Sequence, residues 1–349
     1  MDTCEYDLVV IGSGPAGQKC AIAAAKLGKK VAVVDRKEMV GGACLHTGTI
    51  PSKTLREAIL YLTGFRERSF YGRDYAVSNE ITVADLALRV RRAVAGELEV
   101  VRAQLARNHV VSLSGAAHFV DPHTLEVTSS QGTTRVAGKY VLVACGTRPA
   151  ASADVPVDGD RIIDSDQILA RDTLPREIIV VGAGVIGLEY ASMFSALNIK
   201  VTLIEGRSTI LDFVDRELVD GLTYSMRKRG AVFRLGEHVV SVGYDEKKRV
   251  VARLESGKEV HGDSLLYTVG RQGNADRMSL SNAGLAADER GRIAVNEGYQ
   301  TVVPHVYAAG DVIGFPALAS TSMEQGRLAS CHMFGACPER GTAEVPYGI

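Results

Sequence analysis

The chain has 349 residues, of which 46% are hydrophobic and 23% are charged, and its 40 basic and 41 acidic side chains leave a formal net charge of -1. This composition is ordinary for a globular protein, and the length favours two domains because single cores stop growing near ~250–300 residues. The balanced charge, without a basic tail or stripe, argues against a nucleic-acid partner. The apolar run over 178–188 ends at Glu189, short of the ~20 residues that a membrane helix needs, so no membrane partner is expected.

The cysteines and the first residues indicate the compartment. The opening residues include Asp2 and Glu5 and lack the basic and then apolar pattern of a secretion signal. Six cysteines stand at irregular spacing, which is typical of free thiols rather than of a disulfide framework. We therefore expect a cytoplasmic protein without disulfides, and we expect no metal site.

The predicted elements begin with a strand over 6–11, a helix over 15–27 and a second strand over 30–34. Both strands are short apolar runs typical of strands buried on two faces, and a glycine follows the helix as its stop signal. Next come a long helix over 81–108 and a strand that begins at residue 110. The stretch over 115–136 is strand-like with turns at 121–122 and 131–132, and a buried strand over 139–145 follows it.

The opening pattern begins again after a linker over 147–157. A strand over 178–181, a helix over 185–197 and a strand over 200–204 repeat the first three elements. A further helix is predicted over 215–229, and a meander of short strands over 231–262. This internal repetition indicates two units of the same kind.

The first strand and helix are joined by a glycine-rich turn. Its residues are Gly12-Ser13-Gly14-Pro15-Ala16-Gly17, which fit the pattern G-x-G-x-x-G. The first glycine allows the tight turn, the second lets a pyrophosphate approach the backbone, and the third lets helix and strand pack closely. The phosphates then meet the free N–H groups of the helix N-terminus. Asp35 ends the second strand, where a carboxylate accepts from ribose hydroxyls, so this unit is expected to bind a dinucleotide.

The same pattern recurs at Gly182-Ala183-Gly184-Val185-Ile186-Gly187, and Glu205 ends the strand that follows. We favour two ligands over two halves of one fold, because each unit has its own acid and its own following strand. Glu205 favours the free 2′-hydroxyl of NAD, since a carboxylate repels a 2′-phosphate. Arg207 either supplies the compensating charge for NADP or is a solvated surface arginine, and both interpretations remain open.

The residues between the two units resemble a known family. The segment Gly41-Gly42-Ala43-Cys44-Leu45-His46-Thr47-Gly48-Thr49-Ile50-Pro51-Ser52-Lys53 is similar to the G-G-x-C-x-x-x-x-C-x-P-S-K pattern of the class I pyridine nucleotide–disulfide oxidoreductases. In that family the two cysteines form a redox-active disulfide beside the flavin. Here Thr49 replaces the second cysteine, and a threonine can neither form a disulfide nor take electrons from reduced flavin. The other cysteines stand at no spacing that suggests a replacement: Cys4, Cys20, Cys145, Cys331 and Cys337.

Three later segments agree with this resemblance. The run Cys145-Gly146-Thr147-Arg148-Pro149 resembles the A-T-G-x-x-P strand that closes the flavin domain, with cysteine where alanine is usual. The run Val306-Tyr307-Ala308-Ala309-Gly310-Asp311 matches the second flavin signature, in which the aspartate binds the ribityl chain. Residues 319–326 resemble the helix whose N-terminus faces the flavin ring.

The resemblance implies an α/β fold with two three-layer dinucleotide-binding domains, the NAD(P) domain being inserted in the FAD domain. The FAD domain is expected over 1–150 and 272–345, and the NAD(P) domain over 151–271. Family members continue into a C-terminal dimerisation domain and form homodimers, whereas this sequence ends at Ile349. We therefore expect a chain without that domain, monomeric or prone to aggregate, that turns over poorly.

The Cys-x-x-x-x-Thr segment resembles the soluble pyridine nucleotide transhydrogenases of this family. That resemblance implies FAD-dependent hydride transfer between NADPH and NAD by a ping-pong mechanism without a redox disulfide. Three alternatives remain: another thiol-free NAD(P)H:acceptor flavin reductase, a disulfide reductase of the dihydrolipoamide dehydrogenase type, and a nucleotide-binding remnant without turnover. Thr49 is the feature that argues against the disulfide reductase.

The resemblance also implies the site residues. Lys53 and Glu189 are expected to form a charge pair beside flavin N5, where the positive charge stabilises the reduced flavin. The residues expected to bind FAD, NAD or NADP are Gly12, Gly14, Pro15, Ala16, Gly17, Asp35, Arg36, Gly42, Ala43, Cys44, Thr49, Lys53, Ala117, Cys145, Gly146, Thr147, Gly182, Gly184, Val185, Ile186, Gly187, Glu205, Arg207, Gly270, Gly310 and Asp311.

Overall fold

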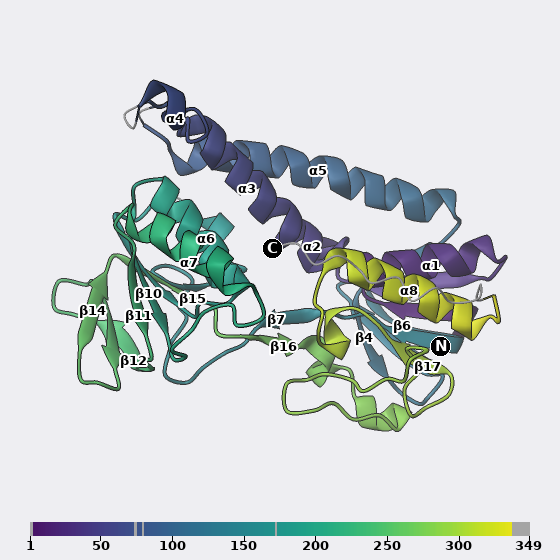
Figure 1. The fold of residues 1–349 in the computed structure, drawn as a ribbon. Coiled ribbons are helices and arrows are strands. Elements are labelled where there is room, and N and C mark those ends of the chain that lie inside the picture. Colours follow the sequence, from purple (N-terminus) through teal and green to yellow (C-terminus); the bar gives the residue numbers. More distant parts are fainter. Residues whose placement is uncertain (1–2, 73–74, 79, 172, 337–349) are drawn as a thin grey trace. The chain divides into compact units, whose positions relative to one another are not determined.

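The structure is a computed structural model that describes residues 3–72, 75–78, 80–171 and 173–336, drawn in chain order in Figure 1. The described residues form two compact units, each with its own hydrophobic clusters. Within these ranges, unit 1 contains residues 3–51, 93–148 and 272–336, and unit 2 contains residues 52–92 and 149–271. Cys337 and the end of the chain, on which the expectation about dimerisation depends, lie outside the described residues.

Unit 1 is built on a seven-stranded sheet in the order β3-β2-β1-β6-β5-β4, in which β17 also pairs with β6. Strands β1, β2, β3, β6 and β17 run parallel, whereas β5 is antiparallel to both β4 and β6. The strands are β1 (Thr3–Ile11), β2 (Val31–Asp35), β3 (Val111–Ser114), β4 (Ala116–Phe119), β5 (Thr124–Ser129), β6 (Gly132–Val143) and β17 (Val306–Ala308).

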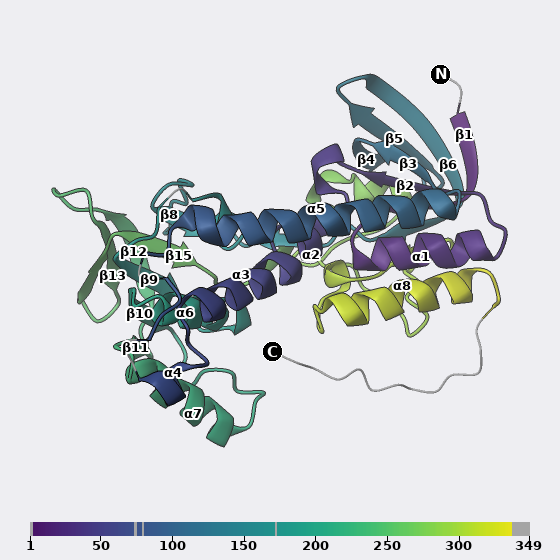
Figure 2. The same cartoon turned by 90° about the horizontal axis from the view of Figure 1, so that it is seen from above.

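The two faces of this sheet are both buried, because successive side chains of a strand point to opposite faces. Leu8 and Val10 of β1 lie in one cluster, with side chains of three helices, while Val9 and Ile11 lie in another, with side chains of β4 and β5. The three helices are α1 (Pro15–Lys26), the later part of α5 (Val83–Arg107) and α8 (Ala319–Met333). Figure 2 shows α1 lying between α5 and α8.

The close packing of α1 on α8 depends on a glycine. A Cβ built on Gly326 of α8 would lie 2.1 Å from the carbonyl oxygen of Ala16 in α1. No side chain fits at that distance, so only glycine allows the two helices to approach this closely. The approach brings the beginning of α8 beside the beginning of α1.

Unit 2 contains a five-stranded parallel sheet in the order β11-β10-β9-β15-β8. A three-stranded antiparallel sheet, β12-β13-β14, covers one of its faces, where Ile179 and Val181 of β9 are buried. The strands are β8 (Ile162–Asp164), β9 (Glu177–Val181), β10 (Lys200–Glu205), β11 (Val232–Leu235), β12 (Val239–Tyr244), β13 (Val250–Leu254), β14 (Glu259–Gly262) and β15 (Ser264–Tyr267).

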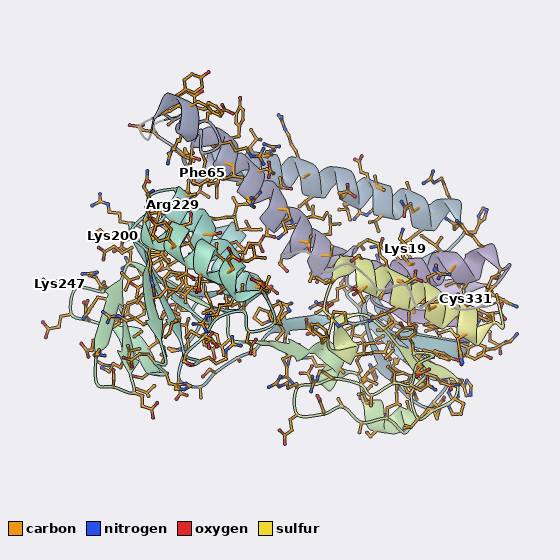
Figure 3. The ribbon with its side chains drawn as sticks, in the orientation of Figure 1. Lys19, Phe65, Lys200, Arg229, Lys247 and Cys331 are labelled. Carbon is orange, nitrogen blue, oxygen red and sulfur yellow. The ribbon has the colours of Figure 1, made fainter. Side chains whose placement is uncertain are left out.

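Helices cover the opposite face of the unit 2 sheet, where Ile178 and Val180 are buried. Side chains from α3 (Thr49–Leu62), α5, α6 (Val185–Ala196) and α7 (Arg216–Arg227) belong to the same cluster. The guanidinium group of Arg229, just after α7, lies over the ring of Phe65, 4.5 Å from its centroid. Figure 3 labels both residues. The remaining helices are α2 (Gly42–His46) and α4 (Arg68–Tyr71). Among the described residues, no helix is both long and apolar enough to span a membrane.

Most predicted elements of both repeats are present, with ends that differ by one to three residues. Three predictions were wrong. The strand over 139–145 is not separate but the second half of β6, because one continuous strand pairs with β5 and then with β1. Residues 232–235 are not part of a meander: β11 joins the parallel sheet beside β10. The linker over 147–157 begins with a strand, β7 (Thr147–Pro149), which pairs with β16 (Arg271–Gly273). Helices α2 and α3 are additional to the predicted elements.

Candidate nucleotide-binding sites

The first glycine turn contains two glycines that the chain itself requires. Gly12 has a φ of +100°, and a Cβ there would lie 2.3 Å from the carbonyl oxygen of Ala144. A Cβ on Gly17 would lie 1.9 Å from the carbonyl oxygen of Gly12. The first glycine is therefore needed for backbone conformation and packing, and the third for packing of α1 on the turn.

The middle glycine has no such explanation within the chain. Gly14 has a φ of -64°, which any residue adopts. The nearest heavy atom to a Cβ on Gly14 would be the Cα of Gly42, at an ordinary contact distance of 3.9 Å. Neither conformation nor packing within the chain requires glycine here, whereas a ligand that approaches the backbone closely would require it. A pyrophosphate has that requirement.

The beginning of α1 offers unpaired donors to such a ligand. Gly14 is the N-cap residue and Pro15 is the first helical residue, and neither caps the helix with a side chain. The first turn also contains no acidic residue. The N–H groups of this turn and the positive end of the helix dipole are thus free to bind an anion.

Asp35 lies at the end of β2, beside the same turn. Its Oδ2 accepts hydrogen bonds from the backbone N–H of Ser13 at 2.7 Å and from the Ser13 hydroxyl at 2.6 Å. Burial raises the pKa of Asp35 above its ordinary value, although these bonds and the one from the backbone N–H of Arg36 act to lower it. Ser13 was missed as a site residue; it stands at a variable position of the motif, and only its contacts reveal its role. The Arg36 side chain is exposed.

The second glycine turn repeats this arrangement in unit 2. Gly182 has a φ of +99°, and a Cβ there would lie 2.8 Å from the carbonyl oxygen of Thr268. A Cβ on Gly187 would lie 2.0 Å from the carbonyl oxygen of Gly182, whereas a Cβ on Gly184 would meet nothing within 4 Å. Helix α6 begins after Gly184 with Val185 and Ile186, and it has neither a side-chain cap nor an acid in its first turn. As at Gly14, neither the backbone conformation nor the packing of the chain requires glycine at position 184.

Glu205, at the end of β10, corresponds in position to Asp35. Its Oε2 accepts from the backbone N–H of Ala183 at 2.8 Å, and its Oε1 accepts from Nε of Arg207 at 3.0 Å. Burial acts to raise the pKa of Glu205, but the hydrogen bonds from Arg207 and Ala183 outweigh it, and the net pKa is lowered. Glu205 is therefore ionised at neutral pH. Arg207 also lies 3.8 Å from Asp212, and half of its side chain is exposed.

The structure brings Cys44 and Thr49 together, as the family pattern implies. The Thr49 hydroxyl lies near enough to the Cys44 thiol group to affect its pKa. Burial and the nearby charge of Asp311 raise the pKa of Cys44, whereas Thr49 acts to lower it. Ala43 precedes Cys44 in α2, and Gly42 packs on the first glycine turn, where its Cβ would lie 2.8 Å from the Cα of Gly14.

The other predicted FAD residues of unit 1 lie at the ends of β6 and β17. Cys145 and Gly146 follow β6, and burial raises the pKa of Cys145 to about 12. The Thr147 hydroxyl donates to Oδ2 of Asp311 at 3.4 Å. The backbone N–H of Gly310 donates to Oε1 of Gln325 in α8 at 2.8 Å, a link that the sequence analysis missed because the two residues belong to separate patterns.

Two predicted residues lie farther along the sheets. Ala117 is in β4 and packs against the unit 1 cluster that contains Val9. Gly270 of unit 2 has a φ of +85°, and a Cβ there would meet nothing within 4 Å. No contact of either residue identifies a ligand.

Lys53 and Glu189 form the predicted ion pair, within unit 2. The Nζ of Lys53 in α3 lies 2.7 Å from Oε1 of Glu189 in α6. The Ser52 hydroxyl donates to the same oxygen at 3.1 Å. Glu189 is thus paired with a cation and a hydroxyl in a helix that contains no other charged residue, where an unpaired carboxylate would be unfavourable. Ser52 was missed as a site residue, although it belongs to the P-S-K segment that identified Lys53.

Known proteins resemble this chain over almost its full length. The soluble pyridine nucleotide transhydrogenase of Mycobacterium bovis (strain BCG / Pasteur 1173P2) is 53% identical over 348 residues, which are 99% of this chain and 74% of that protein. The protein of the same name from Klebsiella pneumoniae is 42% identical over 348 residues, which are again 99% of this chain and 74% of that protein. Among solved structures, LpdA from Mycobacterium tuberculosis superimposes with a TM-score of 0.87 at 27% identity, covering 99% of this chain and 74% of that one.

A second solved structure is the HOCl-induced flavoprotein disulfide reductase RclA from Escherichia coli. It superimposes with a TM-score of 0.84 at 27% identity, covering 97% of this chain and 73% of that one. The family profile described as pyridine nucleotide-disulphide oxidoreductase matches residues 6–326. The fold is thus α/β with two Rossmann-like units, and the cofactors of this family are FAD and NAD(P). Two repeated nucleotide turns, their carboxylates and this match together establish that the chain belongs to the family of pyridine nucleotide-disulphide oxidoreductases.

Proposed function

We propose that this protein catalyses FAD-dependent hydride transfer between NADPH and NAD without a redox disulfide. The observation that carries the proposal is the pairing of Cys44 with Thr49 in a chain that has two complete nucleotide turns. A disulfide reductase needs a second thiol at this place to relay electrons, and a hydroxyl group has no such redox chemistry. Hydride exchange between two nicotinamide nucleotides needs no thiol. The names of the relatives at 53% and 42% identity support the same reaction.

Unit 1 has the features that FAD requires. Gly14 leaves space for a pyrophosphate, and the N–H groups at the beginning of α1 are free to bind it. Asp35 would accept from the ribose of the adenosine part, while Asp311 would bind the ribityl chain, as the family resemblance implies. Gly42, Ala43, Cys44, Thr49 and the residues after β6 would complete this site. We therefore propose residues 1–150 and 272–345 as the FAD-binding domain.

Unit 2 would bind the nicotinamide nucleotides in turn. The turn at Gly184 and the beginning of α6 offer the same free donors to a second pyrophosphate. Glu205 would accept from the 2′-hydroxyl of NAD, and Arg207 would contribute to binding NADP. When bound, FAD would supply the hydride-transfer chemistry between the two nucleotides, and the proposed scheme is ping-pong. We propose residues 151–271 as the NAD(P)-binding domain and the cytoplasm as the compartment in which the protein works.

The Lys53–Glu189 pair would support this reaction electrostatically. Lys53 carries a positive charge that would favour the anionic reduced flavin. Glu189 would hold the ammonium group in one position by the 2.7 Å contact, with help from Ser52. Lys53 is thus the proposed catalytic residue, and Glu189 and Ser52 are positioning residues.

The deciding experiment follows hydride transfer from NADPH to thio-NAD, whose reduced form absorbs at its own wavelength, with FAD-loaded protein. Parallel reactions replace thio-NAD by lipoamide, by glutathione disulfide or by a quinone, and protein stripped of FAD is the control. We expect turnover with thio-NAD and none with the two disulfides. Turnover with a disulfide would overturn the proposal, and turnover with the quinone alone would identify the protein as another thiol-free flavin reductase.

A further inference from the structure

A cavity in unit 2 lies apart from the glycine turn of that unit. Its volume is about 860 Å³, within the range of small-molecule sites. Its lining comes from residues that follow α3, from residues just before β9 and from residues just after α6. The amino ends of β9 and β10 are at this edge of the parallel sheet, whereas the nucleotide turn follows the carboxyl end of β9. The five residues of β9 separate the two edges by about 16 Å, so the cavity is not part of the nucleotide site.

The lining of this cavity is mostly polar and has an excess of positive charge. Its polar residues are Thr63, Arg68, Ser78, Glu80, Arg176 and Asn198. Two arginines against one glutamate leave one positive charge in excess. Such a lining suits an anionic ligand better than an apolar one, because an apolar ligand would leave the charged groups without partners.

The arginines at this cavity have no carboxylate partner among the residues that the structure describes. Neither Arg68 nor Arg176 forms an ion pair there, with Glu80 or with another acid, whereas the neighbouring Arg66 lies 3.0 Å from Glu57. The Nε of Arg68 donates to the backbone carbonyl of residue 75 at 3.2 Å, which holds the guanidinium group without neutralising its charge. The positive charge of the cavity is therefore available to a ligand.

A third arginine adds to the positive charge beside Arg68. The guanidinium group of Arg229 lies over the ring of Phe65, which precedes Arg68 by three residues. Its Nη2 donates to the neutral hydroxyl of Ser225 at 3.1 Å. Burial lowers the pKa of Arg229, and the nearby positive charge of Arg68 lowers it further. Two arginines that repel each other, and that pair with no acid in the described ranges, would both be stabilised by a bound anion.

We propose that this cavity binds a small molecule with at least two negative charges, held by Arg68 and Arg176. A guanidinium group binds phosphate and carboxylate oxygens with two parallel N–H groups, so two arginines suit a ligand with two anionic groups. Glu80 limits the affinity, because its carboxylate repels the same ligand. The site goes beyond the proposed function and does not depend on it, since neither the flavin nor a nicotinamide nucleotide takes part.

The test titrates FAD-loaded protein with inorganic pyrophosphate and with citrate by calorimetry, at constant ionic strength. The two probes distinguish a phosphate ligand from a carboxylate ligand. The variants are Arg68→Met, Arg176→Met and Glu80→Gln. Arg253→Met is the matched control, because Arg253 is also an arginine of unit 2 but pairs with Glu259 at 2.9 Å in the three-stranded sheet. A second titration in saturating NADP⁺ shows whether the probe occupies the nucleotide site instead.

We expect saturable binding of at least one probe, weakened about tenfold by Arg68→Met and by Arg176→Met, which is the size of one charge-assisted contact. Glu80→Gln should strengthen the binding, a gain that no folding defect imitates. Arg253→Met should match the wild type, and NADP⁺ should not displace the probe.

Three results would overturn the proposal. They are the absence of binding of both probes at millimolar concentration, displacement of the probe by NADP⁺, and a loss of affinity in Arg253→Met equal to that in Arg68→Met. The melting temperature of each variant shows whether it is folded. Failure of the proposed function looks different, because the protein would then bind the probe as expected but transfer no hydride.

Discussion

The carboxylate at the end of each second strand has a different environment in the two units. Among the described residues, Asp35 accepts from the neutral donors of Ser13 and the backbone N–H of Arg36, whereas Glu205 is held by the Arg207 side chain. Burial raises the pKa of Asp35, and the Arg207 contact lowers that of Glu205 against the effect of burial. A cation beside the second carboxylate agrees with a site that must accept a nucleotide with or without an extra phosphate.

Glu205 and Arg207 should divide the nucleotide preference between them. Glu205→Ala should improve NADPH binding relative to NADH, because it removes a repelling charge, and Arg207→Ala should do the reverse. Arg207 is half exposed, so we expect changes near tenfold rather than hundredfold. Because its pKa is lowered, Glu205 stays ionised, and its effect should be constant from pH 6 to pH 8. Equal effects of both substitutions on both nucleotides, measured by calorimetry, would contradict this.

Thr49 should make the enzyme indifferent to thiol chemistry. Arsenite requires two neighbouring thiols and should not inhibit the wild type. Thr49→Cys should restore a disulfide with Cys44, since the two side chains already lie near each other, and thiol titration with mass spectrometry would detect it. Cys44→Ala combined with Thr49→Cys is the control that cannot form this bond. Inhibition of the wild type by arsenite would show that another pair of thiols takes part.

Lys53 should matter for its charge rather than for stability. Lys53→Met should slow reduction of bound FAD by NADPH about tenfold to a hundredfold, because a favourable charge is lost where negative charge develops. Lys200→Met is the control: Lys200 is labelled in Figure 3 and also pairs with a glutamate of unit 2, Glu177 at 2.9 Å. Stopped-flow absorbance measures both rates. If the two variants are reduced equally fast, Lys53 has only a structural role.

At the scale of the elements, each nucleotide site is a strand, a turn and a helix whose first N–H groups have no side-chain cap. Two of the three glycines maintain the close packing of turn and helix, and the middle one does not. Stability and ligand binding therefore depend on different glycines of the same turn.

Substitutions in the second turn should separate these roles. Gly187→Ala should lower the melting temperature, since its Cβ would lie 2.0 Å from the Gly182 carbonyl oxygen. Gly184→Ala should leave the melting temperature of nucleotide-free protein within about 1 °C, because its φ is -73° and nothing lies within 4 Å. The same substitution should nevertheless weaken the binding of NADP⁺ and NAD⁺ by about tenfold or more, because the added methyl group would occupy the place of the phosphates. Unchanged affinity for Gly184→Ala would place the pyrophosphate elsewhere.

At the scale of the whole molecule, the hydrophobic clusters of each unit are formed by residues of that unit. A unit with its own core can unfold in its own transition. A ligand stabilises the part that it binds, by about 2.7 kcal/mol at a hundred times its dissociation constant.

Calorimetric scans should consequently resolve two transitions, one for each unit. Adding FAD to flavin-free protein should raise the midpoint temperature of one transition, and adding NADP⁺ should raise the midpoint temperature of the other. Gly184→Ala should abolish the shift caused by NADP⁺ and keep the shift caused by FAD. If both ligands raise the midpoint temperature of the same transition, the assignment of one ligand to each unit is wrong.

The local patterns were readable from the sequence alone. Both glycine turns, the acids Asp35 and Glu205, and Thr49 in place of a cysteine are short-range features, because each depends on residues adjacent in the chain or on one strand–turn–helix unit. The family resemblance also predicted the Lys53–Glu189 pair, which the structure contains. The repeated strands and helices followed from the periodicity of their apolar residues.

Contacts between distant segments were decided only by the tertiary structure. Pairing of β11 with β10 places His238 on Gly206, and nothing in the spacing of these residues indicates it. Strand order and loop paths arise from the burial of all apolar faces together, so no short stretch of sequence contains them. For the same reason, only the tertiary structure could show which glycines of each turn the packing requires and which it does not.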